Sequence, residues 1–416
     1  MRKVSDKLRI LVSLLLAAAT LLSACGGAER ETEKGTDPGT PAATTAAAQE
    51  EKTTAAQEEK TTAASEAATE AEPGGRAMNE LRSKAVAYMK EMSSVIWIPE
   101  KDFKVENEFI AGQRYKGLPY TNVVDSSLEE FLSKLEKGIY VGETTPSLAT
   151  GVDCSSSMLA AWNTVITDCK AVWSRDLVPG MGYGSIQVGE YKLPDTPSDT
   201  AAIIKLNDRQ TMYRAYAQVI PADLMMRYAS AGHCRLVSQY PKLSYLPDGS
   251  IDGDNSFVIV TEITATLAET PEGYLTTWRV DEPYSFTYLY DSLYVPLTTA
   301  ELDAGEAKEV TTVFTDSFDG VDLAEKGLPG RLTCNYRMFE VVAEVKDAAG
   351  KTVRQVADYP VNNPDNTLVM FSKIYKLREL NEGLDLKTLP AGQYTLTLSI
   401  LAAGSLREIR TVSFTR

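Results

Sequence analysis

A cysteine and a histidine are the residues of this sequence whose types and setting suit covalent chemistry. Cys154 stands between Asp153 and Ser155 in a short polar turn that leads into a helical pattern of apolar residues. The free N–H groups and the dipole of a helix favour a thiolate at its start, which lowers the pKa of a thiol there. His233 is the only histidine among the 416 residues. If the thiol uses an imidazole base, that base is therefore His233.

Regular elements must hold these two side chains. Apolar residues recur at helical spacing after Cys154 and predict a helix that runs to about Trp173. His233 opens the first of three strand-like runs, which are predicted at 233–238, 256–266 and 274–280. The turn between the first two runs is acidic. It lacks the terminal glutamate and the flanking helices of an EF-hand, so we interpret it as a solvated hairpin turn.

The composition argues against some classes of partner. The chain carries a formal net charge of −15. Such a charge argues against binding to nucleic acid and against electrostatic docking on anionic lipid. Hydrophobic residues make up 44% of the chain, enough for sizeable cores, and the length predicts two folded domains.

Residues 1–25 are typical of an export signal. Four basic residues precede an apolar stretch that is too short for a comfortable membrane span. The stretch ends in Leu22-Ser23-Ala24-Cys25, which resembles the lipobox of bacterial lipoproteins. The resemblance implies a diacylated Cys25 and an exported protein anchored to the outer face of the cell membrane or envelope. An ordinary signal peptide with a chance cysteine, or a membrane helix, is the alternative.

Composition and periodicity divide the rest of the chain into three parts. Residues 26–76 are rich in Thr, Ala, Glu and Lys with almost no large apolar side chain, so we predict a disordered tether. Residues 77–287 place helical patterns before strand patterns, which predicts an α+β domain. Residues 288–416 alternate strands with turns and show no helical pattern. This pattern predicts an all-β sandwich of immunoglobulin or fibronectin-like kind.

The remaining cysteines do not suggest a disulfide or a metal site. The predicted helix would hold Cys154 and Cys169 roughly 20 Å apart, at about 1.5 Å per residue, which is beyond disulfide reach. The spacings of Cys169, Cys234 and Cys334 do not match a zinc site, and a single histidine disfavours one. We therefore expect these three cysteines to be small buried residues.

Four short blocks carry a family resemblance. They are Gly117-Leu118-Pro119-Tyr120, Asp153-Cys154-Ser155-Ser156, Pro221-Ala222-Asp223-Leu224 and Gly232-His233. In this order they resemble the NlpC-type family of papain-like bacterial cell-wall cysteine peptidases, whose pattern has glycine where Ser156 and Ala222 stand. The resemblance covers residues from about 110 to 265, and a predicted insertion helix at 127–135 separates the first two blocks.

The resemblance assigns roles to individual residues. Cys154 would be the nucleophile and His233 the base that takes its proton and returns it to the leaving amine. The family's third polar residue lies on the next strand, which offers Glu262, with Asp252 and Asp254 as alternatives on the preceding turn. The Cys154 N–H would form part of an oxyanion hole. The substrate cleft would be lined by Tyr120, Asp153 and Ser155. The family needs no metal and no organic cofactor.

The expected function follows from anchor and family together. We expect a lipid-anchored hydrolase of the cell envelope that cleaves amide bonds in peptidoglycan stem peptides through a thioester. The first alternative is a surface lipoprotein whose papain-like fold has lost activity and binds cell-wall glycan or peptide. The second is a structural lipoprotein in which the four blocks coincide by chance.

Overall fold

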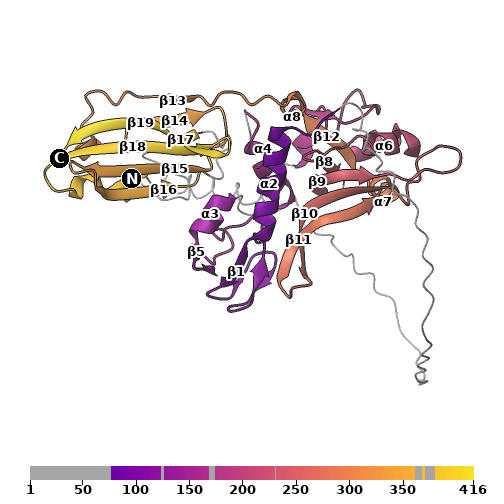
Figure 1. Cartoon of the computed structure of the whole chain (residues 1–416), viewed down its shortest axis with the longest axis horizontal. Coiled ribbons are helices and arrows are strands. Elements are labelled where there is room, and N and C mark those ends of the chain that lie inside the picture. Colours follow the sequence, from indigo (N-terminus) through magenta and orange to yellow (C-terminus); the bar gives the residue numbers. More distant parts are fainter. Residues whose placement is uncertain (1–75, 123–125, 168–173, 230, 361–367, 371–379) are drawn as a thin grey trace, which may run out of the picture. The chain divides into compact units, whose positions relative to one another are not determined.

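The computed structural model describes residues 76–122, 126–167, 174–229, 231–360, 368–370 and 380–416. The expectations for Cys25, for Cys169 and for the tether up to residue 75 lie outside these residues. Within the described part, a mixed α+β region precedes a C-terminal region built mainly of antiparallel strands (Figure 1).

The first region is organised around one mixed sheet of ten strands. Two neighbouring pairs, β1 with β6 and β4 with β11, are parallel, and the others are antiparallel. In the order in which they lie side by side, the strands are β5 (Leu135–Glu136), β6 (Ile139–Tyr140), β1 (Ile96–Pro99), β4 (Tyr115–Lys116), β11 (Leu275–Ser285), β10 (Phe257–Glu269), β9 (Gly232–Lys242), β8 (Leu224–Tyr228), β12 (Val295–Thr299) and β7 (Ser185–Gln187). A separate hairpin joins β2 (Phe103–Lys104) to β3 (Glu108–Phe109).

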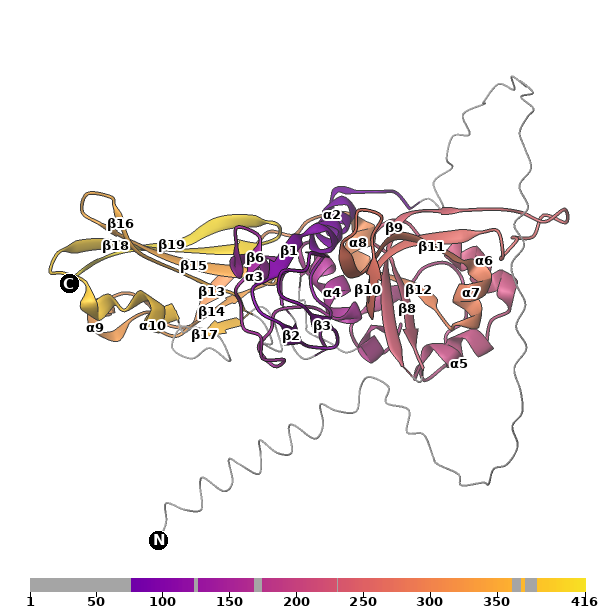
Figure 2. The same ribbon diagram turned by 90° about the horizontal axis from the view of Figure 1, so that it is seen from below.

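Helices flank this sheet on both sides. Figures 1 and 2 show α2 and α4 beside the central strands, with α6 and α7 on the far flank. The helices of this region are α2 (Glu80–Ser94), α3 (Leu128–Ser133), α4 (Cys154–Asn163), the 3₁₀ turn η2 (Ser174–Leu177), α5 (Thr200–Lys205), α6 (Arg209–Tyr216), α7 (Phe286–Asp291) and α8 (Ala300–Ala304).

Side-chain caps explain where several of these helices begin. Asn79 accepts a hydrogen bond from the backbone N–H of Arg82 at the start of α2, and Ser127 accepts one from Glu130 at the start of α3. Such caps satisfy N–H groups that have no partner inside the helix. The insertion helix predicted at 127–135 is therefore present as α3, two residues shorter at its end.

The C-terminal region contains two antiparallel sheets and short helices. The four-stranded sheet has the order β16 (Thr352–Asp358), β15 (Glu340–Asp347), β18 (Gln393–Ala402) and β19 (Ser405–Thr415). Buried and half-buried residues alternate along β15 and β18, as the sequence pattern predicts. The three-stranded sheet contains β13 (Thr312–Phe314), β14 (Arg331–Cys334) and β17 (Leu368–Met370), and the short helices are α9 (Leu323–Lys326), α10 (Leu380–Leu384) and the 3₁₀ turn η3 (Leu386–Thr388).

Each region has a hydrophobic core of its own. Trp97, Trp162 and Trp278 lie in the first core, and Leu332, Val341 and their neighbours form the second. The first sheet extends past residue 287, because β12 pairs with β8 and Leu302 of α8 belongs to the first core.

Two helix predictions are wrong. The helix that begins at Cys154 ends at Asn163 instead of continuing to about Trp173. The Thr164 hydroxyl bonds the Ala161 carbonyl at 2.7 Å, and the β-branched residues that follow have low helix propensity. Helices were also not predicted after Tyr288 or within 176–206, yet α5, α8, α9 and α10 form there. Each spans six residues or fewer, too short for helical periodicity to reveal.

Candidate active site

Cys154 is the first residue of α4, and Asp153 is the cap of that helix. The Asp153 carboxylate accepts hydrogen bonds from the backbone N–H groups of Ser155 and Ser156 at 2.8 and 2.7 Å, and from the Ser155 hydroxyl at 2.9 Å. The Ser156 hydroxyl accepts in return from the Asp153 N–H at 2.8 Å, which completes a capping box. Asp153 and Ser155, predicted to contact substrate, are thus bonded to each other and fix the start of α4.

The segment around Tyr120 lies directly beside the segment that leads into α4. Tyr120 and Val152 form a parallel bridge, and the Thr121 N–H bonds the Val152 carbonyl at 3.0 Å. A Cβ on Gly151 would lie 2.6 Å from the Pro119 carbonyl oxygen, so only glycine permits this approach. Two of the family blocks, separated by α3 in the sequence, are therefore adjacent in space.

His233 and Glu262 meet across two neighbouring strands. His233 lies near the start of β9, Glu262 lies on β10, and the imidazole Nε2 hydrogen-bonds the carboxylate Oε2. Arg235 Nε donates to the same oxygen at 2.8 Å, and the Tyr284 hydroxyl donates to the other oxygen, Oε1. Asp252, an alternative to Glu262, instead accepts from Asp254 and Asn255 within its exposed turn.

These donors determine the charge of Glu262. Burial opposes ionisation, because only 1% of the residue is exposed. The hydrogen bond from His233, the charge of Arg235 and the Tyr284 hydroxyl outweigh burial and lower the pKa of Glu262 to about 2. The carboxylate is therefore ionised throughout the neutral range and can hold an imidazole in one orientation.

Aromatic rings surround the Arg235 guanidinium. Its central carbon lies 3.6 Å from the ring centre of Tyr284 and 4.3 Å from that of Tyr294. The Tyr294 ring also meets the His233 ring edge-on, with centroids 6.4 Å apart. Burial and the hydrogen bond to Glu262 raise the pKa of Tyr284, whereas Arg235 lowers the pKa of Tyr288 against the effect of burial. The hydrogen bond to Glu262 and the contacts with the aromatic rings together fix Arg235 in place.

Cys154 lies near the start of β9. Helix α4 packs against β9 and β10. Burial, followed by the negative charges of Cys154 and Asp153, raises the pKa of the thiol of Cys234, the residue next to His233. The structure thus joins His233 and Glu262 directly and brings Cys154 into electrostatic range of the adjoining residue, Cys234.

Arg235 and Tyr284 are site residues that sequence reasoning missed. The signal for Arg235 was available: it stands two residues after His233 on a predicted strand, so both side chains point to one face. Tyr284 lies on β11 beyond the predicted end of that strand at 280, and only the longer strand brings its hydroxyl to Glu262.

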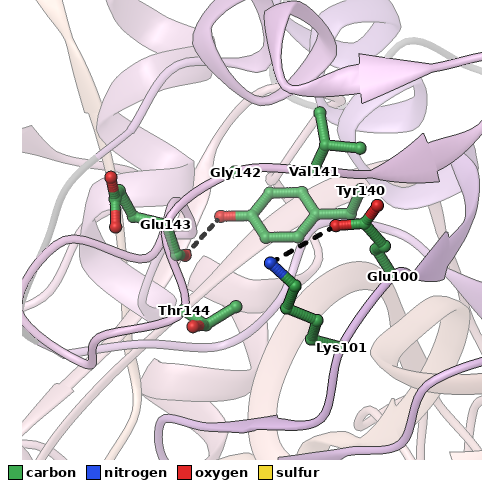
Figure 3. A pocket seen from close by; sticks show the side chains of 7 residues that line it. All are labelled: Glu100, Lys101, Tyr140, Val141, Gly142, Glu143 and Thr144. Atoms are coloured by element: carbon green, nitrogen blue, oxygen red, sulfur yellow. Dashed lines mark hydrogen bonds and ion pairs between the residues drawn. The ribbon is translucent and has the colours of Figure 1, made fainter.

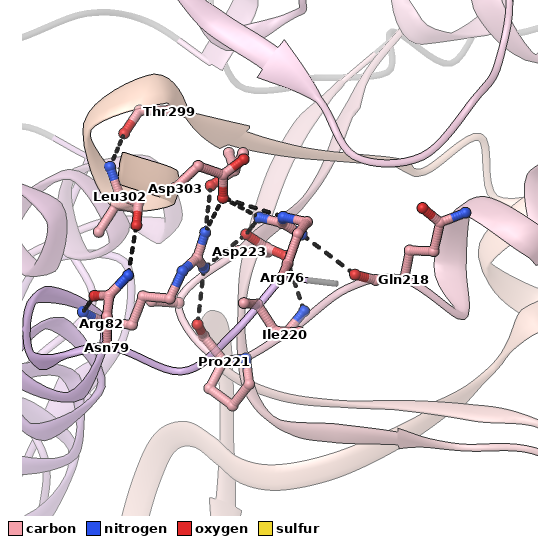
Figure 4. Close-up of polar contacts among 12 residues, drawn as sticks. Arg76, Asn79, Arg82, Gln218, Ile220, Pro221, Asp223, Thr299, Leu302 and Asp303 are labelled. Carbon is pink, nitrogen blue, oxygen red and sulfur yellow. Dashed lines mark hydrogen bonds and ion pairs between the residues drawn. The ribbon is translucent and has the colours of Figure 1, made fainter. Parts of the chain in front are cut away.

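A second charged cluster surrounds Asp223, in the third family block (Figure 4). The fully buried carboxylate of Asp223 accepts from Arg76 at 2.7 and 2.8 Å and from Arg82 at 2.8 Å. Asp303 accepts from both arginines at 2.6 Å, and the Ile220 N–H also donates to Asp223 at 2.8 Å. This cluster ties the start of α2 to α8 and to the turn that leads into β8.

Two hollows lie away from the predicted catalytic residues. One, of about 220 Å³, is lined by residues of α2 and of strands β9, β10 and β11. The other, of about 200 Å³, lies at the ends of β1 and β6 and is lined by Glu100, Lys101, Tyr140, Val141, Gly142, Glu143 and Thr144 (Figure 3). Inside it the Tyr140 hydroxyl donates to the Glu143 carbonyl at 3.0 Å. Cys154, His233 and Glu262 line neither of these two hollows.

Three further features of the described residues are their free thiols, their possible metal ligands and the lengths of their helices. Cys154, Cys234 and Cys334 are buried thiols. Among the residues with described positions, no group of three or more His, Cys, Asp or Glu side chains is arranged to hold a metal ion. In the same part of the chain no helix is long and apolar enough to cross a membrane.

No family model matches the chain, and no curated protein matches it.

Proposed function

We propose that this chain is an exported, lipid-anchored cysteine hydrolase that cleaves amide bonds in peptidoglycan stem peptides. In the proposal Cys25 carries the lipid, residues 26–76 are the tether, and a papain-like domain of NlpC type performs the reaction. The C-terminal sheets would form an immunoglobulin or fibronectin-like sandwich that positions the domain at the wall. The observation that supports the proposal best is the hydrogen bond between His233 and Glu262, on strands against which the capped helix of Cys154 packs.

The reaction would proceed in two steps. His233 takes the thiol proton, and the Cys154 sulfur attacks the amide carbon, so that a C–S bond forms. The C–N bond breaks as the imidazolium gives its proton to the leaving amine, which leaves a thioester. Water, deprotonated by His233, then attacks the thioester; a C–O bond forms, the C–S bond breaks, and the thiol is restored. The Cys154 N–H would stabilise the oxyanion of both steps.

The hydrogen bond at Nε2 of His233 favours this assignment of roles. Nε2 of His233 is occupied by Glu262, so Nδ1 is the nitrogen that would face the sulfur. A carboxylate that accepts the imidazole N–H stabilises the imidazolium that forms during catalysis. The depressed pKa of Glu262, about 2, keeps that carboxylate charged at the pH of the cell surface.

A direct test compares two cysteine variants on purified muropeptides. Cys154→Ala should abolish release of product, since the nucleophile is lost. Cys234→Ala, which removes the buried thiol next to His233, is the matched control and should retain most of the activity. Full hydrolysis by Cys154→Ala would refute the proposal.

A second function is favoured by one specific observation. The charge of Cys154 contributes to the raised pKa of Cys234, and neighbouring strand residues such as His233 and Cys234 point to opposite faces. Leu236 and Thr261, on the face of Cys234, line a hollow with Val86 of α2, the helix packed beside α4. If Cys154 lies on that face, the sheet separates thiol from imidazole. The domain would then bind cell-wall peptide or glycan without cleaving it.

The rate of alkylation separates these two functions. An activated thiolate at Cys154 should react with iodoacetamide near neutral pH faster than a small reference thiol. His233→Ala should slow that reaction if the imidazole is the base. A rate equal to that of the reference thiol, unchanged in His233→Ala, would favour the binding function.

A further inference from the structure

One oxygen atom links an arginine to the candidate base. Glu262 Oε2 accepts from His233 Nε2 and from Arg235 Nε, the latter at 2.8 Å. His233 and Arg235 stand two residues apart on β9, so their side chains extend from one face. A change in the charge at Arg235 therefore acts on the imidazole through a single shared partner.

The bond to Glu262 is the shorter of the two side-chain hydrogen bonds that Arg235 donates within the described residues, at 2.8 Å against 3.4 Å to Tyr288. Arg235 is 4% exposed, and its Nη1 is buried without a hydrogen-bond partner in the described part of the chain. Leaving a charged donor unsatisfied costs free energy that a purely structural side chain would avoid. The stack against Tyr284 and Tyr294 fixes the guanidinium so that Nε points at Glu262.

Other ionisable groups around the imidazole are placed differently. Arg227 of β8 is paired with His233 in register, yet its guanidinium lies over the Tyr294 ring, at 5.7 Å. Tyr288 of α7 bonds Arg235 Nη2 at 3.4 Å. Further titratable groups are Tyr284 on the other carboxylate oxygen, and Tyr294, whose ring meets the imidazole edge-on. Cys154 and Asp153 of α4 act on Cys234, and Arg175 and Asp176 belong to the turn η2, which packs against β9.

We propose that Arg235 is a positioning residue for His233. The guanidinium keeps Glu262 ionised. Because it shares Oε2 with the imidazole, it also offsets the attraction of that carboxylate for a proton on the imidazole. A carboxylate alone favours the imidazolium, whereas a neighbouring guanidinium favours the neutral ring. A base must be neutral before it can accept the thiol proton. The catalytic meaning of this inference rests on the proposed function; the electrostatic relation itself does not.

The single histidine makes the relation directly measurable. In the full chain, one imidazole Cε1–H resonance follows the protonation of His233 as the pH is varied. Arg235→Met should move the titration midpoint upward by about one unit or more, a tenfold change in proton affinity. Arg235→Lys keeps a positive charge and should move it by less than half as much.

Arg337 provides the matched control. It is another buried arginine, 3% exposed, stacked over Phe339 at 4.8 Å, and Arg337→Met should leave the midpoint unchanged. If Arg235→Met does not fold, Glu262→Gln decides: it should move the midpoint downward, because the arginine charge then acts alone. A midpoint that stays within 0.3 units, by a rough criterion, in a folded Arg235→Met chain would overturn the inference.

This measurement is independent of hydrolysis. An inactive protein with the expected shift would retain the arginine relation and refute the proposed function alone. An active protein in which the midpoint does not shift would refute the arginine relation and retain the proposed function. In an active protein, Arg235→Met should also move the acidic limb of the pH–rate profile upward by the same amount as the midpoint.

Discussion

Two buried carboxyl groups, one in each region of the molecule, have opposite electrostatics. Glu262 in the ten-stranded sheet is 1% exposed, and its pKa is lowered to about 2. Asp358 at the end of β16 is 3% exposed, and burial, together with the negative charge of Glu130, raises its pKa to about 7. Burial is nearly equal, so the partners make the difference.

The comparison shows that hydrogen-bond donors and positive charge gather around Glu262 and not around Asp358. Glu262 is surrounded by an arginine, a histidine and a tyrosine that all donate to it. Asp358 receives a hydrogen bond from the Tyr359 N–H at 2.8 Å, and the like charge of Glu130 works against its ionisation. The first arrangement suits a group that must remain an anion next to a base. The second suits a carboxyl that spends much of its time neutral.

Asp223 offers the most severe test of what such partners contribute. Like Glu262 it is a buried carboxylate, but two arginines hold it, and no imidazole is among its hydrogen-bond partners in the described part of the chain. Asp223→Ala should lower the free energy of unfolding by about 3–5 kcal/mol, since it leaves Arg82 buried without its partner. Urea unfolding followed by tryptophan fluorescence measures this, because all four tryptophans precede residue 288. The half-exposed Asp303→Ala is the control and should cost clearly less.

Asp358 should destabilise the protein progressively as the pH rises. Its folded-state pKa lies above the ordinary value of 3.8, so stability is lost between about pH 4 and pH 7. Three pKa units correspond to about 4 kcal/mol. Asp358→Asn, which keeps an acceptor for the Tyr359 N–H, should therefore be more stable than the parent at pH 8 and equal to it near pH 4. Equal stability of the two chains at both pH values would show that Asp358 is ionised at no cost.

Glu262 should give the opposite dependence. Its folded-state pKa lies below the ordinary value of 4.5, so its contribution is present above about pH 4.5 and is lost as the pH falls toward 2. The shift corresponds to about 3 kcal/mol. Glu262→Gln should flatten the acid limb of the stability profile, measured by tryptophan fluorescence in urea. An unchanged acid limb would mean that Arg235 and His233 do not hold the carboxylate as described.

The smallest expected effect concerns Ala222, next to Asp223. It has a φ of 75°, in the left-handed region where a Cβ is strained. Ala222→Gly should raise the free energy of unfolding by about 0.5–1 kcal/mol, less the cost of the small space that the methyl leaves. Ala215→Gly, at a helical position that is equally buried, should instead lower it. A loss of stability in both variants would place the strain elsewhere.

Patterns that repeat were predictable from the sequence, and pairings between distant elements were not. The α+β order, the strand that contains His233 and the alternation along β18 follow from side-chain periodicity. Ser127 predicted the start of α3, because a hydroxyl residue three positions before a glutamate is a local signal for a helix N-terminus. By contrast, four strands of the large sheet are only two or three residues long, and two of them, β4 and β7, pair with strands that are distant in the sequence.

The candidate site divides in the same way. Cys154 at a helix start and His233 on a strand were visible, since each depends on its immediate neighbours. The choice of Glu262 over Asp252 needed the family pattern, and the hydrogen bond between Glu262 and His233 supports it. Arg235 was overlooked because a charged residue in a strand is usually solvated. The ion pair with Glu262 and the packing of Tyr284 and Tyr294 together make a buried arginine possible.

The position of Arg76 sets a practical limit on shortening this protein. Its guanidinium bridges Asp223 and Asp303, four residues before α2 begins, and the same carboxylates hold the buried Arg82. An expression fragment that starts a few residues before Arg76 keeps both cations of the clamp. A fragment trimmed to Asn79 would look complete by its helices and yet lack half of the positive charge that balances Asp223. Anyone who prepares a soluble domain for crystallisation or screening should therefore cut upstream of Arg76.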